Sequence, residues 1–403
     1  MSQQIQKQLQ MDVEDRPFGT NAIRIYIVSL LFYTASHTLL VLLPLHAHKL
    51  GASPSQIGLI MGAYMFTSMF LRPVAGKIVD KLGTRRVFTA ALLLHTVVVS
   101  LYLIDELAVF AALRMAQGVI LSFVSMVLHL MIVEALPEKS RGQGMSLFSL
   151  SSMLPYTYGP FLVIYFADRV PMFYLFGALI PLALLTLVVG MTIKLPERIM
   201  NAQPGTDGAA DEKPYRAWAD PKLLHPSMIM LLASVIIGTV ASFLPLYLQQ
   251  KSMPYAGLFF LTETIVLVSL RFIGRKKIPT NGYFPTRMIA LFVLLITVSA
   301  TLIRFGGSPV LLVLAAICSG CALSMLYPTL VTYVTFIVPE RARGKGLGLF
   351  IAAADFGTSV GTMVLSFIAD SYSYRVMFSS CIGIGLAAFL LVLLASRRQE
   401  RIG

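Results

Sequence analysis

The chain has 403 residues, of which 57% are hydrophobic and only 13% are charged, and its mean hydropathy is +0.78. This leaves too little polar material to cover a water-soluble body of this size, so the composition indicates a protein embedded in lipid. A net charge of +13 would suit nucleic-acid binding in a soluble protein. Here the basic residues follow the loops of a membrane topology, so we expect no nucleic-acid partner.

About twelve apolar stretches are long enough to cross a hydrocarbon core, which takes roughly 20 helical residues. Their length and weak alternation favour helices over a lipid-facing barrel. They cover residues 22–46, 55–75, 86–104, 107–134, 144–167, 171–193, 226–249, 255–273, 285–304, 309–337, 346–369 and 374–396. The predicted fold class is therefore an all-α integral membrane protein with 12 transmembrane helices.

Lys and Arg residues are unevenly shared between the two sides of this topology. The N-terminal tail, the C-terminal tail and the loops on their side hold about 24 of them, and the opposite loops hold about 5. The positive-inside rule then places both termini in the cytoplasm. The surplus charge also suits contact with anionic membrane lipid.

An internal repeat is the strongest signal of organisation. Residues 136–168 align without gaps on residues 338–370, so that Pro137 and Gly144 recur as Pro339 and Gly346, at a constant offset of 202 residues. This predicts two pseudo-symmetric six-helix halves, the layout of alternating-access carriers. The expected division is a cytoplasmic tail (1–20), a first half (21–194), a cytoplasmic linker (195–225), a second half (226–396) and a second tail (397–403).

The loop after the second stretch combines glycines with an acid flanked by bases. We interpret Gly76, Asp80, Gly83 and Arg85 as a conformational lock, because glycines allow a tight turn and the charges can pair in one state and separate in another. The corresponding loop of the second half, Gly274 to Arg287, is basic but has no acid. The alternative is a charge cluster that only sets topology.

Ionisable residues inside the apolar stretches are few, and each is a candidate for function because burying a charge in lipid is costly. On the fourth stretch Arg114 shares a polar stripe with Gln117, Gly118, Ser125 and His129 at helical spacing, although Arg114 could instead be a structural residue bonded to carbonyls. We expect proton coupling at the acids Glu263 and Asp355, although Asp355 could instead only form a hydrogen bond between helices. The candidate substrate-binding residues are Tyr26, Tyr33, His37, Tyr64, Arg72, His129, Glu263, Arg271 and Tyr327.

Two of these motifs resemble the major facilitator superfamily. The loop from Gly76 to Arg86 is similar to its G-x-L-a-D-r-x-G-r-k signature, with Thr84 in place of the first terminal base, and residues 114–118 are similar to its R-x-x-Q-G motif. The resemblance implies the superfamily fold and links Arg114 to proton-coupled transport. Gly159 and Pro160 resemble the antiporter motif only in that pair.

Further strings resemble the exporters of staphylopine-type opine metallophores. They include IMGAYM at 60–65, RPVAG at 72–76, FLPLY at 243–247 and YPTL at 327–330, and they are spread over both halves. The resemblance implies proton-driven export of a small carboxylated metallophore from a bacterial cell through its cytoplasmic membrane. A multidrug or sugar efflux carrier of the same fold is the alternative.

We expect a monomeric transporter and not an enzyme, with no cofactor and no bound metal. The chain has no G-x-x-x-x-G-K-[ST] string for ATP hydrolysis and no common hydrolase motif. Cys318, Cys321 and Cys381 lie in apolar stretches, and we interpret them as packing residues.

Overall fold

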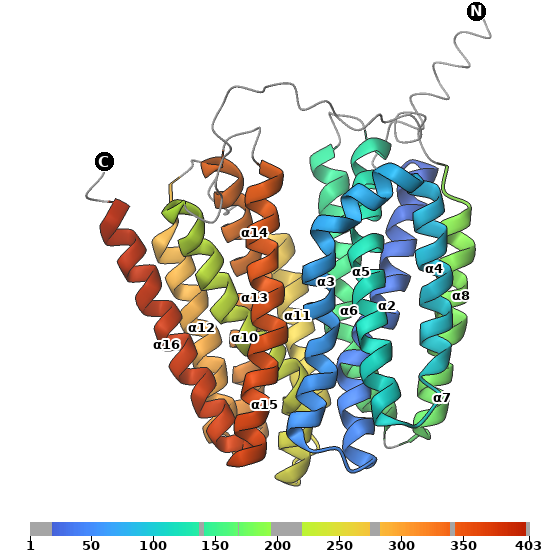
Figure 1. Ribbon diagram of the computed structural model, residues 1–403. Coiled ribbons are helices and arrows are strands. Elements are labelled where there is room, and N and C mark those ends of the chain that lie inside the picture. The colour runs from blue at the N-terminus through green and yellow to red at the C-terminus, as the bar shows by residue number, and fades with distance from the viewer. Residues whose placement is uncertain are drawn as a thin grey trace, which may run out of the picture. The chain divides into compact units, whose positions relative to one another are not determined.

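The computed structural model describes residues 18–136, 141–167, 169–194, 220–274, 283–338 and 343–399, and these are almost entirely helical. Most of the expected linker, 195–219, lies outside the described residues. The helices, shown in Figure 1, are α2 (Thr20–Lys49), α3 (Pro54–Leu82), α4 (Thr84–Leu101), α5 (Leu107–Ala135), α6 (Arg141–Ala167), α7 (Met172–Gly177), α8 (Leu179–Met191), α10 (Pro221–Gln250), α11 (Ala256–Gly274), α12 (Thr286–Phe305), α13 (Pro309–Ile337), α14 (Arg343–Phe356), the π-helix η4 (Gly357–Gly361), α15 (Thr362–Ser371) and α16 (Tyr374–Gln399).

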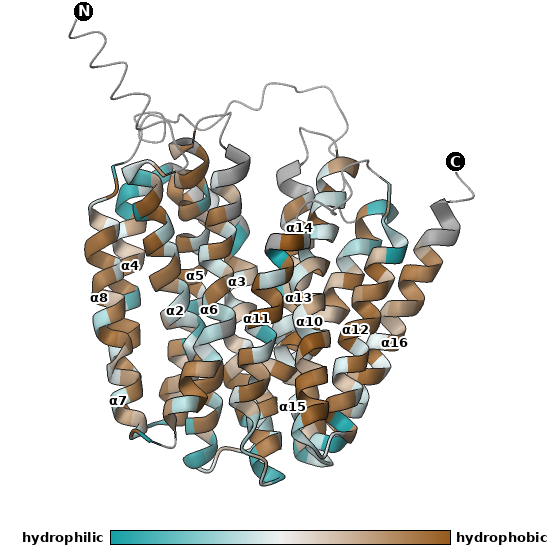
Figure 2. Cartoon of the chain, turned by 180° about the vertical axis from the view of Figure 1, so that it is seen from behind, coloured by the Kyte–Doolittle hydropathy of each residue, from teal (hydrophilic) through white to brown (hydrophobic). Residues whose placement is uncertain are grey.

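Within the described residues, ten helical segments are long and apolar enough to cross a membrane. The second and eighth predicted spans correspond to α3 and α11, which are helical over 29 and 19 residues but are not among those ten. Hydrophobic residues, brown in Figure 2, occur along the length of the helices, as expected for helices that cross a membrane. The molecule is an all-helical, multi-pass membrane protein.

Helix positions extend the repeat well beyond the aligned segment. Five pairs of helices begin 202 residues apart, and the sixth pair, α2 and α10, begins 201 residues apart. The five pairs are α3 with α11, α4 with α12, α5 with α13, α6 with α14, and α7 with α16. The two halves therefore share one helical plan.

The same packing recurs at equivalent positions of this plan. Gly144 lies against Leu136, which follows α5 in an extended conformation, and a Cβ on Gly144 would overlap the methyl carbons of Leu136. Gly346 lies likewise against Val338, the residue after α13, where the distance from a Cβ to a methyl carbon would be 2.7 Å. Glycine is needed at both positions because the helix start is pressed onto the residue that ends the preceding helix.

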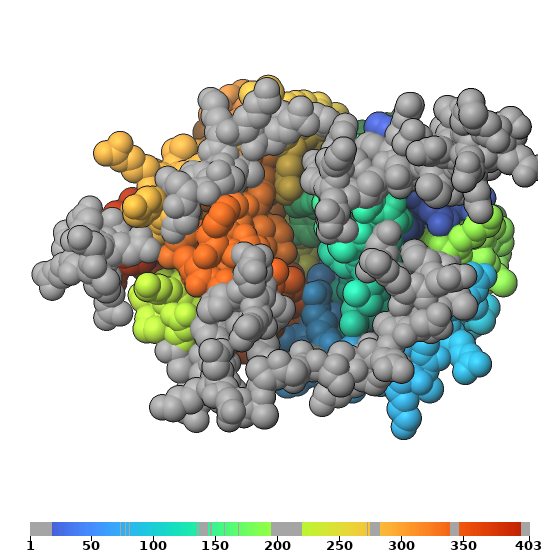
Figure 3. Space-filling view, turned by 90° about the horizontal axis from the view of Figure 1, so that it is seen from above, coloured from blue at the N-terminus to red at the C-terminus, as the bar shows by residue number. Residues whose placement is uncertain are grey.

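The chain folds into two compact units. Unit 1 comprises residues 1–39, 70–159 and 166–208, and α4 packs there against α5 and α8. Its interior is rich in aromatic rings, such as Tyr102 stacked on Phe176 with ring centroids 6.0 Å apart. Figure 3 looks onto the helix ends, with the start of α4 in light blue.

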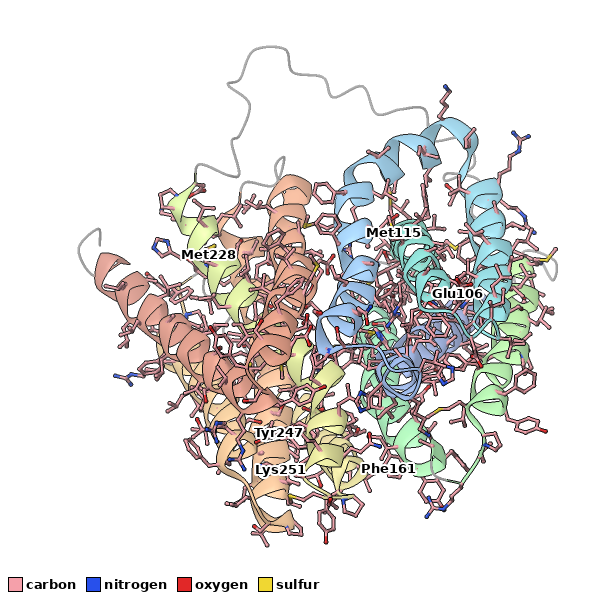
Figure 4. All side chains as sticks on the ribbon, turned by 60° about the horizontal axis from the view of Figure 1, so that its bottom comes forward. Glu106, Met115, Phe161, Met228, Tyr247 and Lys251 are labelled. Atoms are coloured by element: carbon pink, nitrogen blue, oxygen red, sulfur yellow. The ribbon has the colours of Figure 1, made fainter. Side chains whose placement is uncertain are left out.

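Unit 2 comprises residues 40–69, 160–165 and 209–403. In this unit α13 packs against α11 and α12, and α10 packs against α14, η4 and α16. At the end of α10 the Lys251 ammonium lies over the Tyr247 ring at 4.4 Å and donates to the Gly306 carbonyl at 3.0 Å, and Figure 4 labels both residues of the first contact. Gly306 follows the last residue of α12, so the Lys251 ammonium places a positive charge at the C-terminus of that helix, where it is favourable.

Two predicted spans are interrupted helices. The sixth consists of α7 and α8, which follow one another in one column with Ala178 at the junction (Figure 1). The eleventh consists of α14, η4 and α15, with a π-helical turn over Gly357–Gly361. π-Helical turns are rare and frequently mark functional sites.

Candidate functional site

Arg114 forms the centre of a buried hydrogen-bond network on α5. Its side chain is 0% exposed, its Nη1 donates to Gln117 Oε1 at 3.1 Å, and its Nη2 donates to the Leu39 carbonyl at 3.3 Å. The Tyr102 hydroxyl donates to the same Gln117 oxygen at 2.9 Å. The guanidinium charge is thus stabilised by oxygen atoms, which an arginine in a lipid-embedded helix requires. This arrangement fits a structural arginine, and the role in proton coupling stays a prediction.

An aromatic cluster surrounds His37 on α2. The imidazole of His37 is buried, lies parallel to the Tyr33 ring at 5.4 Å and meets the edge of the Tyr156 ring at 5.3 Å. Next to it, Thr34 and Tyr158 share a hydrogen bond between their hydroxyls. The cluster presents flat rings and polar atoms together, a combination that suits a small polar ligand with a planar group.

A close approach of α6 to α2 explains how Tyr156 reaches His37. A Cβ on Gly159 would lie 3.2 Å from the backbone nitrogen of Thr38, so the helices touch through backbone atoms there. The sequence predicted Tyr33 and His37 but not Tyr156. The Gly159 and Pro160 pair was the available signal, because a glycine inside an apolar helix often permits close helix contact.

The other predicted substrate residues of unit 1 lie elsewhere on its helices. Tyr26 on α2 and Arg72 on α3 are half-buried. His129 is exposed near the end of α5, with its Nδ1 2.7 Å from the Ser125 carbonyl and its ring edge-on to Phe148 at 4.8 Å. His129 is therefore held by its own helix and by α6.

The predicted lock residues flank the junction of α3 and α4. Gly83 lies between the two helices with φ +87°, a backbone conformation that residues with a side chain rarely adopt. This explains why the position is occupied by glycine. Arg85 donates to the Met191 carbonyl at 3.0 Å and to the Ile193 carbonyl at 3.1 Å, so it caps the end of α8. Gly76 lies in α3. The side chain of Asp80 is outside the described residues, and the lock stays a prediction.

Unit 2 holds the predicted acids. Glu263 on α11 is 3% exposed, and its Oε1 accepts a hydrogen bond from the Ser319 hydroxyl of α13 at 2.5 Å. Asp355 is half-buried near the end of α14, two residues before η4. The sequence singled out both acids but gave no reason to select Ser319.

Three further predicted residues lie in the same unit. Tyr64 on α3 is 1% exposed, and Arg271 near the end of α11 is half-buried. Tyr327 on α13 packs on the Phe350 ring at 5.7 Å. The candidate substrate and proton residues thus fall in both units. In the part of the chain that the structure describes, no three His, Cys, Asp or Glu residues gather as a metal site.

Comparison with known proteins places the chain in a family. The model of the Major Facilitator Superfamily matches residues 25–281 and 279–402. The staphylopine export protein of Staphylococcus aureus (strain Mu50 / ATCC 700699) is 34% identical over 370 residues, which cover 89% of this chain and 92% of that protein. An uncharacterized MFS-type transporter of Burkholderia mallei (strain SAVP1) is 22% identical, with 96% of this chain and 95% of that protein covered.

Solved structures share the fold at low sequence identity. A mutant of the nucleoside transporter NupG superposes with a TM-score of 0.75 at 13% identity, covering 93% of this chain and 100% of that chain. The human organic anion transporter MFSD10 (TETRAN) gives a TM-score of 0.68 at 17% identity, covering 92% and 98%. These structures show a shared fold. The family match over both halves and the 34% identity to an export protein over most of the chain establish that the chain belongs to the Major Facilitator Superfamily of membrane transporters.

Proposed function

We propose that this chain exports a small opine-type metallophore, of the staphylopine kind, from the bacterial cytoplasm in exchange for protons and by alternating access. The observation that carries the proposal is the 34% identity to a staphylopine export protein over 89% of this chain. A similarity that runs through both halves favours a shared substrate class over a shared fold alone.

The candidate residues offer groups that complement such a substrate. The guanidinium groups of Arg72 and Arg271 suit carboxylates, which they can bind through two parallel hydrogen bonds. Amine or imidazole groups suit Glu263 and the hydroxyls of Tyr64 and Tyr327, while the rings of Tyr33 and His37 suit a planar group. Tyr26 and His129 complete the proposed substrate set.

We assign proton coupling to Arg114, Glu263 and Asp355. A carboxyl group in a lipid-embedded helix is costly to keep ionised, so it can take up and release a proton as its surroundings change between states. Glu263 is 3% exposed and meets this requirement most directly. Residues Gly76, Asp80, Gly83 and Arg85 are proposed as the lock, in a monomeric carrier of the cytoplasmic membrane with both termini inside.

Transport in everted membrane vesicles tests the function. In everted vesicles, export appears as uptake into the vesicle. Staphylopine added outside vesicles with an acidic interior should enter them and make the interior more alkaline, because protons leave the vesicle in exchange for each substrate molecule that enters. An equimolar apolar cationic dye serves as the competing substrate. Dye uptake with no staphylopine uptake would overturn the proposal in favour of a multidrug carrier.

Asp355→Asn tests the second acid. Because an amide cannot carry the proton, we expect staphylopine-dependent alkalinisation to fall at least about tenfold, a change worth roughly 1.4 kcal/mol, at equal protein abundance. Asp370 is a matched surface acid that accepts a hydrogen bond from Ser55, and Asp370→Asn should keep the proton flux. Unchanged flux in Asp355→Asn would remove Asp355 from the coupling mechanism.

A further inference from the structure

Ser319 is the hydroxyl that contacts the buried acid of unit 2. It lies on α13, is 4% exposed and donates from Oγ to Glu263 Oε1 on α11 at 2.5 Å. Because Glu263 is 3% exposed, water has little access to this bond. A short hydrogen bond to a carboxyl group in such a place has a strong influence on the orientation of that group.

The packing of the two helices fixes this contact. A Cβ on Gly320 would lie 2.8 Å from the Glu263 backbone carbonyl and 3.0 Å from Val266 Cβ, so α13 touches the α11 backbone beside Ser319. One turn further along, Ser324 donates to the Leu267 carbonyl at 3.1 Å. These two contacts fix the position of α13 relative to α11 along this seam, the line of contact between the two helices. Ser319 is therefore held opposite Glu263.

We infer that Ser319 is a positioning residue for proton exchange: it holds one carboxyl oxygen of Glu263 so that the group stays in place whether or not it carries a proton. A hydroxyl can donate to a carboxylate and can accept from a protonated carboxyl group, so the contact survives both states. The inference rests on the proposed role of Glu263 in proton coupling. It adds a residue that binds neither substrate nor proton itself.

The pH dependence of transport in Ser319→Ala provides the test. Without the hydroxyl the carboxylate loses a donor, so the protonated form persists to higher pH. The midpoint of staphylopine-dependent proton flux in everted vesicles should move by roughly one unit to higher pH, a tenfold change in the protonation equilibrium. Ser319→Thr, which keeps the hydroxyl, should restore the midpoint.

Ser324→Ala is the matched control. It removes a hydrogen bond between the same two helices but leaves the carboxyl group untouched, so its midpoint should equal that of the wild type. A shift of equal size in Ser324→Ala would mean that loosening the seam is responsible, and the inference would be wrong. Infrared difference spectra give a second readout, since the carboxyl band lost in Glu263→Gln should move in Ser319→Ala.

Failure of the inference can be told apart from failure of the function. If Glu263→Gln abolishes proton flux while Ser319→Ala keeps both the wild-type midpoint and the wild-type carboxyl band, the positioning role is refuted and the proposed function stands. If Glu263→Gln keeps full proton flux, the role of Glu263 is refuted, and the role of Ser319 with it.

Discussion

Arg114 illustrates how the shape of a side chain, beside its charge, determines its contacts. Its planar guanidinium reaches two acceptors on different helices, the Gln117 amide oxygen and the Leu39 carbonyl. Lysine carries the same charge on a single nitrogen and cannot reproduce this fork. The geometry, and not the charge alone, is therefore the property to test.

We expect Arg114→Lys to reduce staphylopine uptake into everted vesicles at least about tenfold, because one of the two acceptors would lose its donor in a site with little water. Tyr102→Phe is the companion variant, since it removes one donor to Gln117 but leaves both arginine bonds. Staphylopine uptake by Tyr102→Phe should fall by no more than roughly threefold. Full uptake by Arg114→Lys, at equal membrane abundance, would show that the charge suffices.

Residue identity predicted only part of the candidate site. Arg114, Glu263 and Asp355 stand out in the sequence because ionisable groups are rare in lipid-embedded helices. Ser319 and Tyr156 do not stand out, since serine and tyrosine are ordinary residues there. They become candidates only through their contacts in the folded chain: Ser319 with Glu263, and Tyr156 with His37.

At the scale of elements, η4 is the clearest departure from regular helix. It packs so closely against α10 that a Cβ on Gly357 would overlap the Leu231 carbonyl, and one on Gly361 would overlap a Val235 methyl carbon. The wider π turn and the glycines together let the two backbones meet. Asp355 lies just before this turn, so its position depends on it.

Gly357→Ala should lower the free energy of unfolding by about 1–3 kcal/mol, because the added methyl group would overlap a backbone carbonyl that cannot move freely. Thermal unfolding of the purified protein in detergent measures the change. Gly348 on α14 is the matched control, since nothing lies within 4 Å of its would-be Cβ. Gly348→Ala should therefore be neutral or stabilise by up to about 1 kcal/mol. Equal stability of the two variants would contradict the tight packing at η4.

Hydropathy predicted where helices lie but not how they are interrupted. The fourth predicted span, 107–134, differs from α5 by one residue at its end. The breaks within the sixth and eleventh spans were not expected, because apolar composition does not report hydrogen-bond register. Equivalent helix starts can also differ in backbone, since Gly83 precedes α4 with φ +87° while Pro285 precedes α12 with φ −81°.

For the whole molecule, the basic residues predict orientation. By the positive-inside rule, the surplus of Lys and Arg on one side predicts that both termini lie in the cytoplasm. Alkaline phosphatase fused after Gly403 should then be inactive, and a green fluorescent protein at the same place should fluoresce. The same pair of reporters fused after Gly51, in the first loop, should give the reverse pattern. An active phosphatase at the C-terminus would refute the orientation.

The common spacing of the helix pairs has a consequence for how the two halves came to differ. From the start of the second helix to the start of the sixth, each half has the same length, so no net insertion or deletion separates them. The aspartate at position 80 has glycine as its counterpart 202 residues later, at position 282, whereas Arg85 has Arg287. The two loops therefore differ in side chains and in local backbone but not in length, so a graft of one loop onto the other half would need no insertion or deletion.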